Sequence, residues 1–260
     1  MRRAMWSRIA AVPIALLLLA LGIQPAFAAQ RFIIGGTGAD EDYPFMASLQ
    51  LTPSGQHLCG GSLIAPTWIV TAAHCVQGRA TNTLTARIGS SDRTQGGEVV
   101  RPAQFIVHPD YNPAAAGADI ALVRLSTPVD ATPIELGTET SVGTQTRLLG
   151  WGQTCPTPGC GTAPVMLRQL QTTILAAARC TAAFNPSVEL CTNNPGGNQG
   201  ACYGDSGGPQ ITPVDGRWRL LGITSRPGNQ DTTCATGPTI YTSAVAYTDW
   251  INEHVEASPA

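Results

Sequence analysis

Gly204-Asp205-Ser206-Gly207-Gly208-Pro209 determines how the rest of this 260-residue chain is interpreted. A serine set among glycines allows a sharp backbone bend and lets a substrate carbonyl approach main-chain N–H groups, as a nucleophile with an oxyanion hole requires. Glycine-rich turns that contain Ser and Asp are also common in ordinary loops. The stretch gains a catalytic meaning only if the chain also supplies a base and an acid for Ser206.

A histidine and an aspartate occur in settings that suit such a serine. Thr71-Ala72-Ala73-His74-Cys75 places His74 after an apolar run, among residues too small to cover it, and Asp119 begins the apolar run 120–125. Taken singly, His74 is more typical of a structural histidine and Asp119 of a solvated strand end. Together they fit a scheme in which a histidine takes the serine proton and an ionised acid fixes the histidine tautomer. The order His74, Asp119, Ser206 is one of the three chain orders known for that scheme.

The composition is that of a globular chain without an electrostatic attraction to polyanions. Hydrophobic residues make up 43% and charged residues 12%, enough for one large β domain or two small ones that share a cleft. The net charge is -2 and no run is rich in Lys or Arg. We therefore expect no nucleic acid and no anionic membrane surface among the partners.

Residues 1–28 are typical of a secretory signal peptide. Positions 2, 3 and 8 are arginines, residues 9–23 are apolar apart from Pro13, and Ala26-Phe27-Ala28 resembles a cleavage site. A retained membrane anchor is less favoured because the apolar segment is shorter than the roughly 20 residues that a span needs. We predict a secreted, extracellular protein with no membrane association after signal removal, whereas the export route stays open. Residues 29–32 would remain as a short propeptide.

The cysteines predict a disulfide framework. All eight follow the signal segment, and an even number in an exported chain favours four bridges. Zinc is disfavoured because the sequence has no Cys-x-x-Cys and no His-Glu-x-x-His, and its four histidines are scattered. We expect no metal and no cofactor. The cysteines stand at Cys59, Cys75, Cys155, Cys160, Cys180, Cys191, Cys202 and Cys234.

Short apolar runs alternate with turn-forming clusters along most of the chain, which favours a β-sandwich or barrel. They form two β units of similar size, and the boundary is expected at about 126–143. The segment 243–256 is the one good helix candidate, since Ser243 can cap it and apolar residues recur at helical spacing. The expected strands cover 45–51, 61–64, 68–72, 83–88, 98–107, 120–125, 146–150, 167–174, 189–191, 209–211, 218–224 and 239–241.

Over nearly all of residues 33–260, the chain resembles the chymotrypsin and trypsin family of secreted serine endopeptidases. The motifs that carry the resemblance are Ile33-Ile34-Gly35-Gly36, Thr71-Ala72-Ala73-His74-Cys75, Asp119-Ile120-Ala121-Leu122, Gly150-Trp151-Gly152, Cys202 to Pro209 and Pro238-Thr239-Ile240-Tyr241-Thr242. The resemblance implies an all-β fold of two six-stranded antiparallel β-barrels with a C-terminal helix. His74 and Asp119 would come from the first barrel and Ser206 from the second.

The resemblance also implies the parts around the triad. The N–H groups of Gly204 and Ser206 would form the oxyanion hole, and Ser225 would lie beside Asp119. Three bridges are implied, Cys59–Cys75, Cys180–Cys191 and Cys202–Cys234. Cys155 and Cys160 then remain, five positions apart, and are expected to close a small loop outside the family's common set.

Activation by cleavage is implied in the same way. The freed amino group of Ile33 would turn inward and pair with Asp205, because a buried carboxylate needs a partner. The cut must follow Phe32, so a chymotrypsin-like or autolytic cut is favoured over a tryptic cut after Arg31. The active chain would then have 260 − 32 = 228 residues.

The specificity pocket departs from the pattern of trypsin. Gly200 is expected at its base, where a trypsin carries an aspartate, and Ala201, Ser225, Pro227 and Thr239 are expected around it. Bulk at the last two favours small or medium apolar side chains. The register through 226–234 leaves a preference for Leu or Phe open. Arg226 stands where the family usually has a tryptophan.

Two classes of function follow. The favoured one is a monomeric endopeptidase that acts on protein or peptide substrates, with protein protease inhibitors as further partners. The alternative is a catalytically weak or inactive homologue that acts as a binding protein, although such homologues usually lose a triad residue. An esterase with the same triad is set aside because the Gly-x-Ser-x-Gly elbow and a βα alternation are missing.

Overall fold

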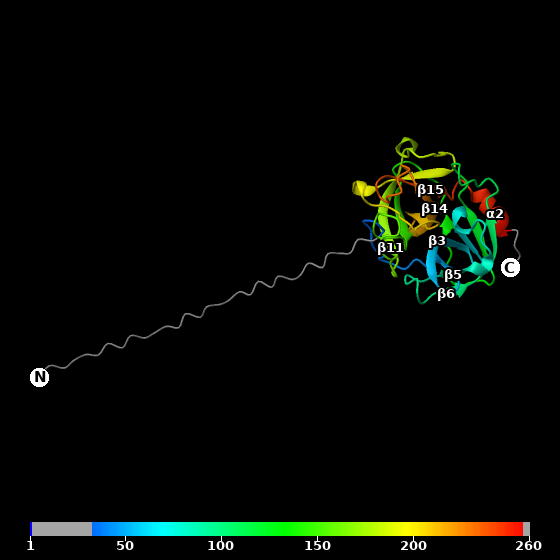
Figure 1. The fold of residues 1–260 in the computed structure, drawn as a ribbon, viewed down its shortest axis with the longest axis horizontal. Coiled ribbons are helices and arrows are strands. Elements are labelled where there is room, and N and C mark those ends of the chain that lie inside the picture. The colour runs from blue at the N-terminus through cyan, green and yellow to red at the C-terminus, as the bar shows by residue number, and fades with distance from the viewer. Residues whose placement is uncertain (2–32, 257–260) are drawn as a thin grey trace.

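The computed structural model describes Met1 and residues 33–256, which fold into two curled sheets and a short C-terminal helix (Figure 1). The expected propeptide, and all of the expected signal peptide apart from Met1, lie outside the described residues. Within the described part of the chain, no helix has the length and apolar character needed to cross a membrane.

The first sheet has the strand order β6-β5-β2-β3-β4-β8-β7 and is antiparallel throughout. Its edges are linked by the chain itself, because β6 pairs with β5, β7 pairs with β8, and only Arg101 separates β6 from β7. The segment 98–107, expected as one strand, is therefore a bent pair of strands that curls the sheet into a half-barrel. The strands are β2 (Met46–Leu51), β3 (Gln56–Ala65), β4 (Trp68–Thr71), β5 (Leu84–Ile88), β6 (Glu98–Val100), β7 (Pro102–Val107) and β8 (Ala121–Leu125).

The second sheet is a closed six-stranded barrel. Its strands follow the order β11-β10-β13-β14-β15-β12, and β12 pairs again with β11. Two short strands that were not expected from the sequence join it: β1 pairs with β11, and β9 lies parallel to β14. The strands are β1 (Thr37–Gly38), β9 (Glu135–Leu136), β10 (Gln145–Gly150), β11 (Arg168–Leu175), β12 (Glu189–Thr192), β13 (Pro209–Val214), β14 (Arg217–Pro227) and β15 (Thr239–Ser243).

The helices are short. The C-terminal helix, α2, covers Thr248–Glu256, so the expected start at Ser243 is wrong. Ser243 ends β15, and its hydroxyl accepts a hydrogen bond from the Ala246 N–H in the turn before the helix. The other helical segments are α1 (Ala73–Val76), η1 (Thr81–Thr83), η2 (Ala177–Arg179) and η3 (Pro195–Gly197).

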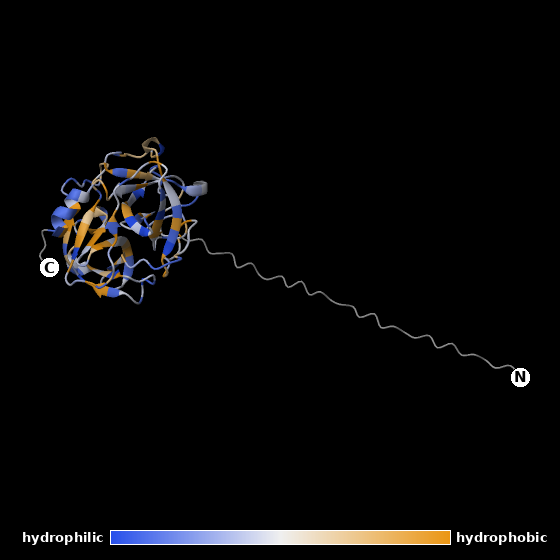
Figure 2. Cartoon of the chain, turned by 180° about the vertical axis from the view of Figure 1, so that it is seen from behind, coloured by the Kyte–Doolittle hydropathy of each residue, from blue (hydrophilic) through white to orange (hydrophobic). Residues whose placement is uncertain are grey.

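The C-terminal helix packs against the first sheet although it follows the second in sequence. Tyr247 and Ile251 belong to the core cluster that contains Leu63 and Ile120 of the first half. Figure 2 shows hydrophobic residues along many of the strands around this core. The chain thus returns to its first half before it ends.

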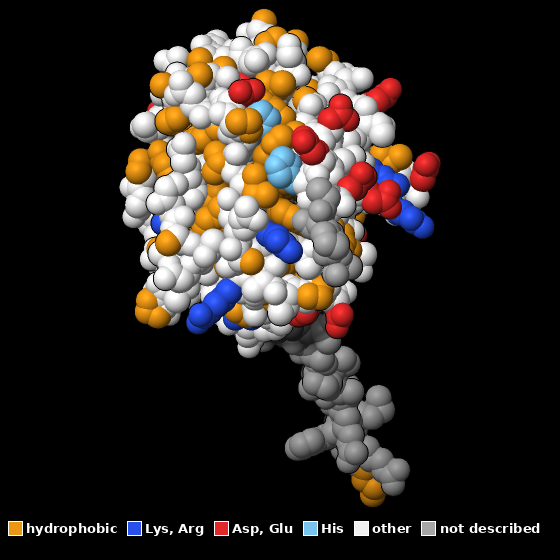
Figure 3. Space-filling model, turned by 90° about the vertical axis from the view of Figure 1, so that its right-hand side faces the viewer, with side chains coloured by type: hydrophobic (Ala, Val, Ile, Leu, Met, Phe, Trp, Pro, Cys, Tyr) orange, Lys and Arg blue, Asp and Glu red, His pale blue; other side chains and the backbone are white. Residues whose placement is uncertain are grey.

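Four disulfides tie the loops together. They are Cys59–Cys75, Cys155–Cys160, Cys180–Cys191 and Cys202–Cys234, as expected. On the face shown in Figure 3, the basic side chains, which are all arginine, are scattered and form no dense patch.

Candidate active site

The loop that carries Ser206 lies against the first sheet. The N–H of Gly60 in β3 donates to the carbonyl of Ser206 (2.8 Å), and the Thr71 hydroxyl donates to the carbonyl of Gly60 (2.8 Å). Gly207 has φ 77°, and a Cβ there would lie 2.2 Å from the Thr71 hydroxyl oxygen. Only glycine allows this approach. The loop therefore brings Ser206 beside the end of β4, from which the chain leads directly to His74.

His74 and Asp119 meet because their strands are paired. Thr71 at the end of β4 lies opposite Ala121 at the start of β8, so the residues just beyond these ends come together. The His74 Nδ1 lies 2.8 Å from the Asp119 Oδ2, and the His74 backbone N–H donates to the Asp119 Oδ1 (3.0 Å). A carboxylate only accepts hydrogen bonds, so Nδ1 carries the proton and Nε2 of the neutral ring keeps a lone pair.

The Asp119 carboxylate is held ionised in a nearly closed site. Its side chain is 8% exposed, whereas that of His74 is 33% exposed. Burial alone would raise the pKa of Asp119, but hydrogen bonds from the His74 ring, the Ser225 hydroxyl (2.7 Å) and the His74 backbone lower it below its ordinary value. Thr242 adds a hydrogen bond to the backbone carbonyl of Asp119 (3.0 Å). These contacts fix Asp119 from both halves of the chain.

The backbone around Ser206 presents two available donors. Gly204 has φ 98°, and among the described residues the N–H groups of Gly204 and Ser206 donate to no other group. Such N–H groups next to a serine can receive a developing oxyanion. Within the same described part, no hydrogen bond joins the Ser206 hydroxyl to His74. Catalytic hydrogen bonds are often long before substrate binds.

His57 supports this loop, and nothing in the sequence pattern pointed to it. Its Nε2 lies 2.9 Å from the carbonyl of Gly204, and its Nδ1 lies 2.8 Å from the Ser48 hydroxyl. A carbonyl only accepts, so Nε2–H is the donor and Nδ1 accepts from Ser48 in the neutral ring. Burial lowers the pKa of His57 to about 4, against the opposing effect of the bond to Gly204. The ring is therefore neutral at pH 7 and orients the Gly204 peptide.

Asp205 is a buried carboxylate with backbone donors. Its oxygens accept from the N–H groups of Gly152 and Cys202, both at 2.8 Å. A Cβ on Gly152 would lie 2.2 Å from Asp205 Oδ2, which explains why Gly150-Trp151-Gly152 contains glycines. Burial raises the pKa of Asp205 to about 6, although both backbone hydrogen bonds lower it. Among the described residues, Asp205 has no cationic partner.

The expected partner of Asp205 lies in the same barrel. Ile33 is buried in the cluster that also holds Tyr241. Burial raises the pKa of Tyr241, and the charge of Asp205 raises it further, so the carboxylate is close to this cluster. Ile34 forms a bridge with Gly200. The Ile33–Asp205 ion pair itself requires a free amino group and stays a prediction.

A pocket of about 140 Å³ opens beside Ser206. Four of the residues expected around it line it, namely Ala201, Ser225, Pro227 and Thr239. A Cβ on Gly200 would lie 3.8 Å from the hydroxyl oxygen of Thr239, which lines the pocket, and the place of Gly200 at the base stays a prediction. The sequence pattern missed Asn229, Thr233, Ala235, Thr236, Gly237 and Pro238, which also line the pocket. No Asp or Glu is among the described residues that line it.

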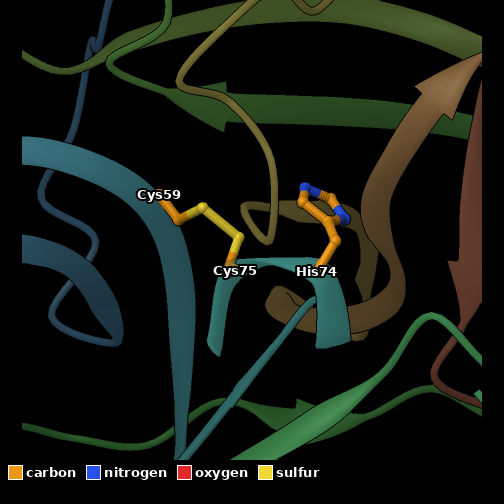
Figure 4. A group of neighbouring side chains, drawn as sticks. All are labelled: Cys59, His74 and Cys75. Carbon is orange, nitrogen blue, oxygen red and sulfur yellow. A yellow bond between two sulfur atoms is a disulfide. The ribbon is translucent and has the colours of Figure 1, made fainter. Parts of the chain in front are cut away.

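Cys59, His74 and Cys75 lie close enough together to suggest a metal site (Figure 4). The two sulfur atoms, however, form the Cys59–Cys75 disulfide, and the His74 Nδ1 is engaged by Asp119. Disulfide sulfurs are not thiolates, and the thiolate is the form that binds metal. The bridge instead anchors the helical turn that carries His74.

A closed barrel next to a half-barrel, with a histidine–aspartate pair beside the glycine-flanked Ser206, defines the chain as a serine endopeptidase. The family model described as Trypsin matches residues 33–251. The chain belongs to the trypsin family.

Relatives of several lengths support this assignment. A protein of Saccharopolyspora erythraea described as Trypsin is 33% identical over 240 residues, which cover 86% of this chain and 99% of the relative. The proteins described as Serine protease 56 are 32% identical in Mus musculus and 33% in Homo sapiens, over 88% and 87% of this chain. The chain spans only 39% of each of these two relatives.

Proposed function

We propose that this chain is a secreted endopeptidase that cleaves peptide bonds through an acyl-enzyme on Ser206. The hydrogen-bonded pair of His74 and Asp119 carries the proposal, because it prepares an Nε2 lone pair beside the loop of Ser206. A serine alcohol is a poor nucleophile without such a base.

The proposed reaction assigns a step to each of these groups. The Ser206 hydroxyl passes its proton to the His74 Nε2 as its oxygen attacks the peptide carbonyl, and Asp119 stabilises the imidazolium that forms. The N–H groups of Gly204 and Ser206 donate to the oxyanion. His74 next protonates the leaving amine as the C–N bond breaks. Water, deprotonated by His74, then hydrolyses the ester and restores Ser206.

Small or medium apolar side chains suit the pocket best. The described residues that line it include no anion for a Lys or Arg side chain, and they include Pro227 and Thr239, which are bulkier than glycine. Pro227 also lacks the N–H that could bind an extended substrate, which weakens binding by roughly 0.5–1.5 kcal/mol. Cleavage of a library with every residue at the cleaved position tests this preference, and dominant cutting after Arg or Lys refutes it.

Activation is proposed to require a new N-terminus at Ile33. A buried carboxylate without a cation, as Asp205 is in the described chain, is the observation that motivates it. N-terminal sequencing of the active form decides the matter, since any start other than Ile33 contradicts the proposal. We propose that the exported enzyme acts as a monomer on proteins or peptides and is open to protein inhibitors.

The central test compares Ser206→Ala and His74→Ala with Ser126→Ala, which alters an exposed serine elsewhere. Each active-site variant should lower kcat by at least about 10⁴-fold, because the members of a triad act as a unit. The Ser126→Ala variant should keep the full rate. Undiminished cleavage by both active-site variants refutes the mechanism. An inactive wild-type chain with an N-terminus at Ile33 would instead favour the alternative of a binding protein.

A further inference from the structure

An ion pair with one fully buried and one partly exposed partner lies where the second barrel meets the loop of Asp119. Glu189 begins β12, and its side chain has 0% exposure. Arg226 lies near the end of β14, and its NH1 is 2.6 Å from the Glu189 Oε1. A charge as deeply buried as that of Glu189 is costly unless it is paired and hydrogen-bonded. The contacts of both partners lead toward the active site.

Glu189 holds the turn that precedes Asp119. Its Oε1 also accepts from the N–H of Gly117 (2.8 Å), and its Oε2 accepts from the N–H of Asn185 (2.7 Å). Gly117 and Ala118 both have left-handed backbones, with φ 88° and 55°. A left-handed conformation is unfavourable for Ala118, and such strain persists only where the surroundings impose it. The bond from Gly117 to Glu189, together with a bond from the Ala118 N–H to the Tyr247 hydroxyl (2.8 Å), provides that constraint.

Arg226 is linked to Asp119 through the hydroxyl group of Ser225. Its NH1 also donates to the Ser225 hydroxyl (3.3 Å), which in turn donates to the Asp119 Oδ2. A register shift between Thr224 and Arg226 in the pairing of β14 with β15 leaves Ser225 as the extra residue. Bulges of this kind re-aim a side chain. The NH2 group of Arg226 is tied to the carbonyl of Ala183 (2.6 Å), so the guanidinium is fixed by three groups.

We propose that Glu189 and Arg226 are positioning residues for Asp119. They act through the Gly117 turn on one side and through Ser225 on the other, and so set the orientation of His74. This role rests on the proposed triad. It also accounts for a charged side chain at position 226, which lines the substrate pocket, because the guanidinium there is paired with Glu189.

The experiment uses the full chain, processed to Ile33, and two substrates. One is a short ester that carries a single amino acid, and the other is an extended peptide with the same residue at the cleaved bond. Glu189→Gln and Arg226→Met should each lower kcat on both substrates by about 10- to 100-fold, the scale that a misplacement of the order of 1 Å produces. Arg226→Lys should fall between these variants and the wild type, because an ammonium keeps the charge but cannot reproduce the planar fork. Glu135→Gln breaks the remote pair with Arg219 and should leave kcat unchanged.

Amide hydrogen exchange gives a second readout that does not need activity. Glu189→Gln and Arg226→Met should speed exchange at Gly117 and Ala118, while the amides of β10 stay as protected as in the wild type. The proposal is overturned if kcat on the short ester is unchanged and only KM for the extended peptide rises, because the pair would then only line the substrate groove. It is equally overturned if exchange at Gly117 and Ala118 does not change. Failure of the proposed function gives a different result, an inactive wild-type chain whose variants still alter exchange at these two amides.

Discussion

Replacing Asp205 by Asn in the uncleaved chain should remove part of the pH dependence of the free energy of unfolding. In the chain that continues before Ile33, burial raises the pKa of Asp205 to about 6 from an ordinary 3.8. An acid whose folded-state pKa is raised contributes most stability below its unfolded pKa, and this contribution is lost as pH rises through the folded-state pKa. The full loss corresponds to about 3 kcal/mol, of which about 2.5 kcal/mol falls between pH 4 and pH 8. Asparagine does not titrate, so the Asp205→Asn chain should not show this loss of stability.

The assay is urea unfolding of both chains at pH 4, 6 and 8, in a Ser206→Ala background that prevents self-cleavage. The free energy of unfolding of Asp205→Asn minus that of its parent should increase by about 2.5 kcal/mol from pH 4 to pH 8. Taking the difference cancels groups that both chains share, such as Asp119 and His57. A difference that is flat with pH, or that falls as pH rises, refutes the reasoning. After cleavage at Ile33 the new amino group should remove most of the effect.

Three further predictions concern the surroundings of the triad and the loops. Ser225→Ala removes a hydrogen-bond donor to Asp119, so the pKa of Asp119 should rise. In a pH–rate profile, the decrease of activity toward low pH should then begin at a higher pH than in the wild type. An unchanged profile contradicts this prediction. His57→Phe leaves the Gly204 carbonyl without its donor and should lower kcat by about 5- to 100-fold, the range that an unsatisfied buried acceptor implies, whereas KM should change little. Removing Cys155–Cys160, which closes a loop of 5 residues, should lower the free energy of unfolding by about 2 kcal/mol in denaturant unfolding. Removing Cys202–Cys234, which closes a loop of 32 residues, should lower it by about 4 kcal/mol. Equal losses would show that the entropy of loop closure does not govern the effect of the two disulfides.

The sequence predicts most strands because their signals are local. Leu84, Ala86 and Ile88 alternate with less buried residues in β5, which is the period that a half-buried strand requires. The predicted start of the C-terminal helix is wrong because that prediction also relied on a local signal. Ser243 has the chemistry of a helix cap, but pairing of β15 with β12 and β14 extends the strand through this region. Tertiary pairing thus overrides a valid local signal.

Residues of the candidate site can be proposed from the sequence where a motif surrounds them, but not where only geometry gives them a role. His74, Asp119 and Ser206 stand in distinctive local sequences, and the fold brings their elements together. His57 and Glu189 have no such setting, since one faces Gly204 from 147 positions away and the other faces Gly117 from 72. Contacts between residues so far apart in the sequence produce no local pattern that a single sequence could reveal. Arg226 was noticed as a departure from the family pattern, but its partner could not be named.

The contacts around Asp119 also fix when the site can first exist. The ribosome makes the chain from its N-terminus, so His74 and Asp119 emerge more than a hundred residues before Thr242 and Tyr247. The groups that hold the Asp119 loop, including Glu189, Ser225, Thr242 and Tyr247, are added only afterwards. A nascent chain that ends between Ser206 and Ser225 therefore lacks Ser225, Thr242 and Tyr247, although His74, Ser206 and Glu189 have been made. The complete set of restraints on Asp119 therefore forms only when the last strand and the C-terminal helix have been made.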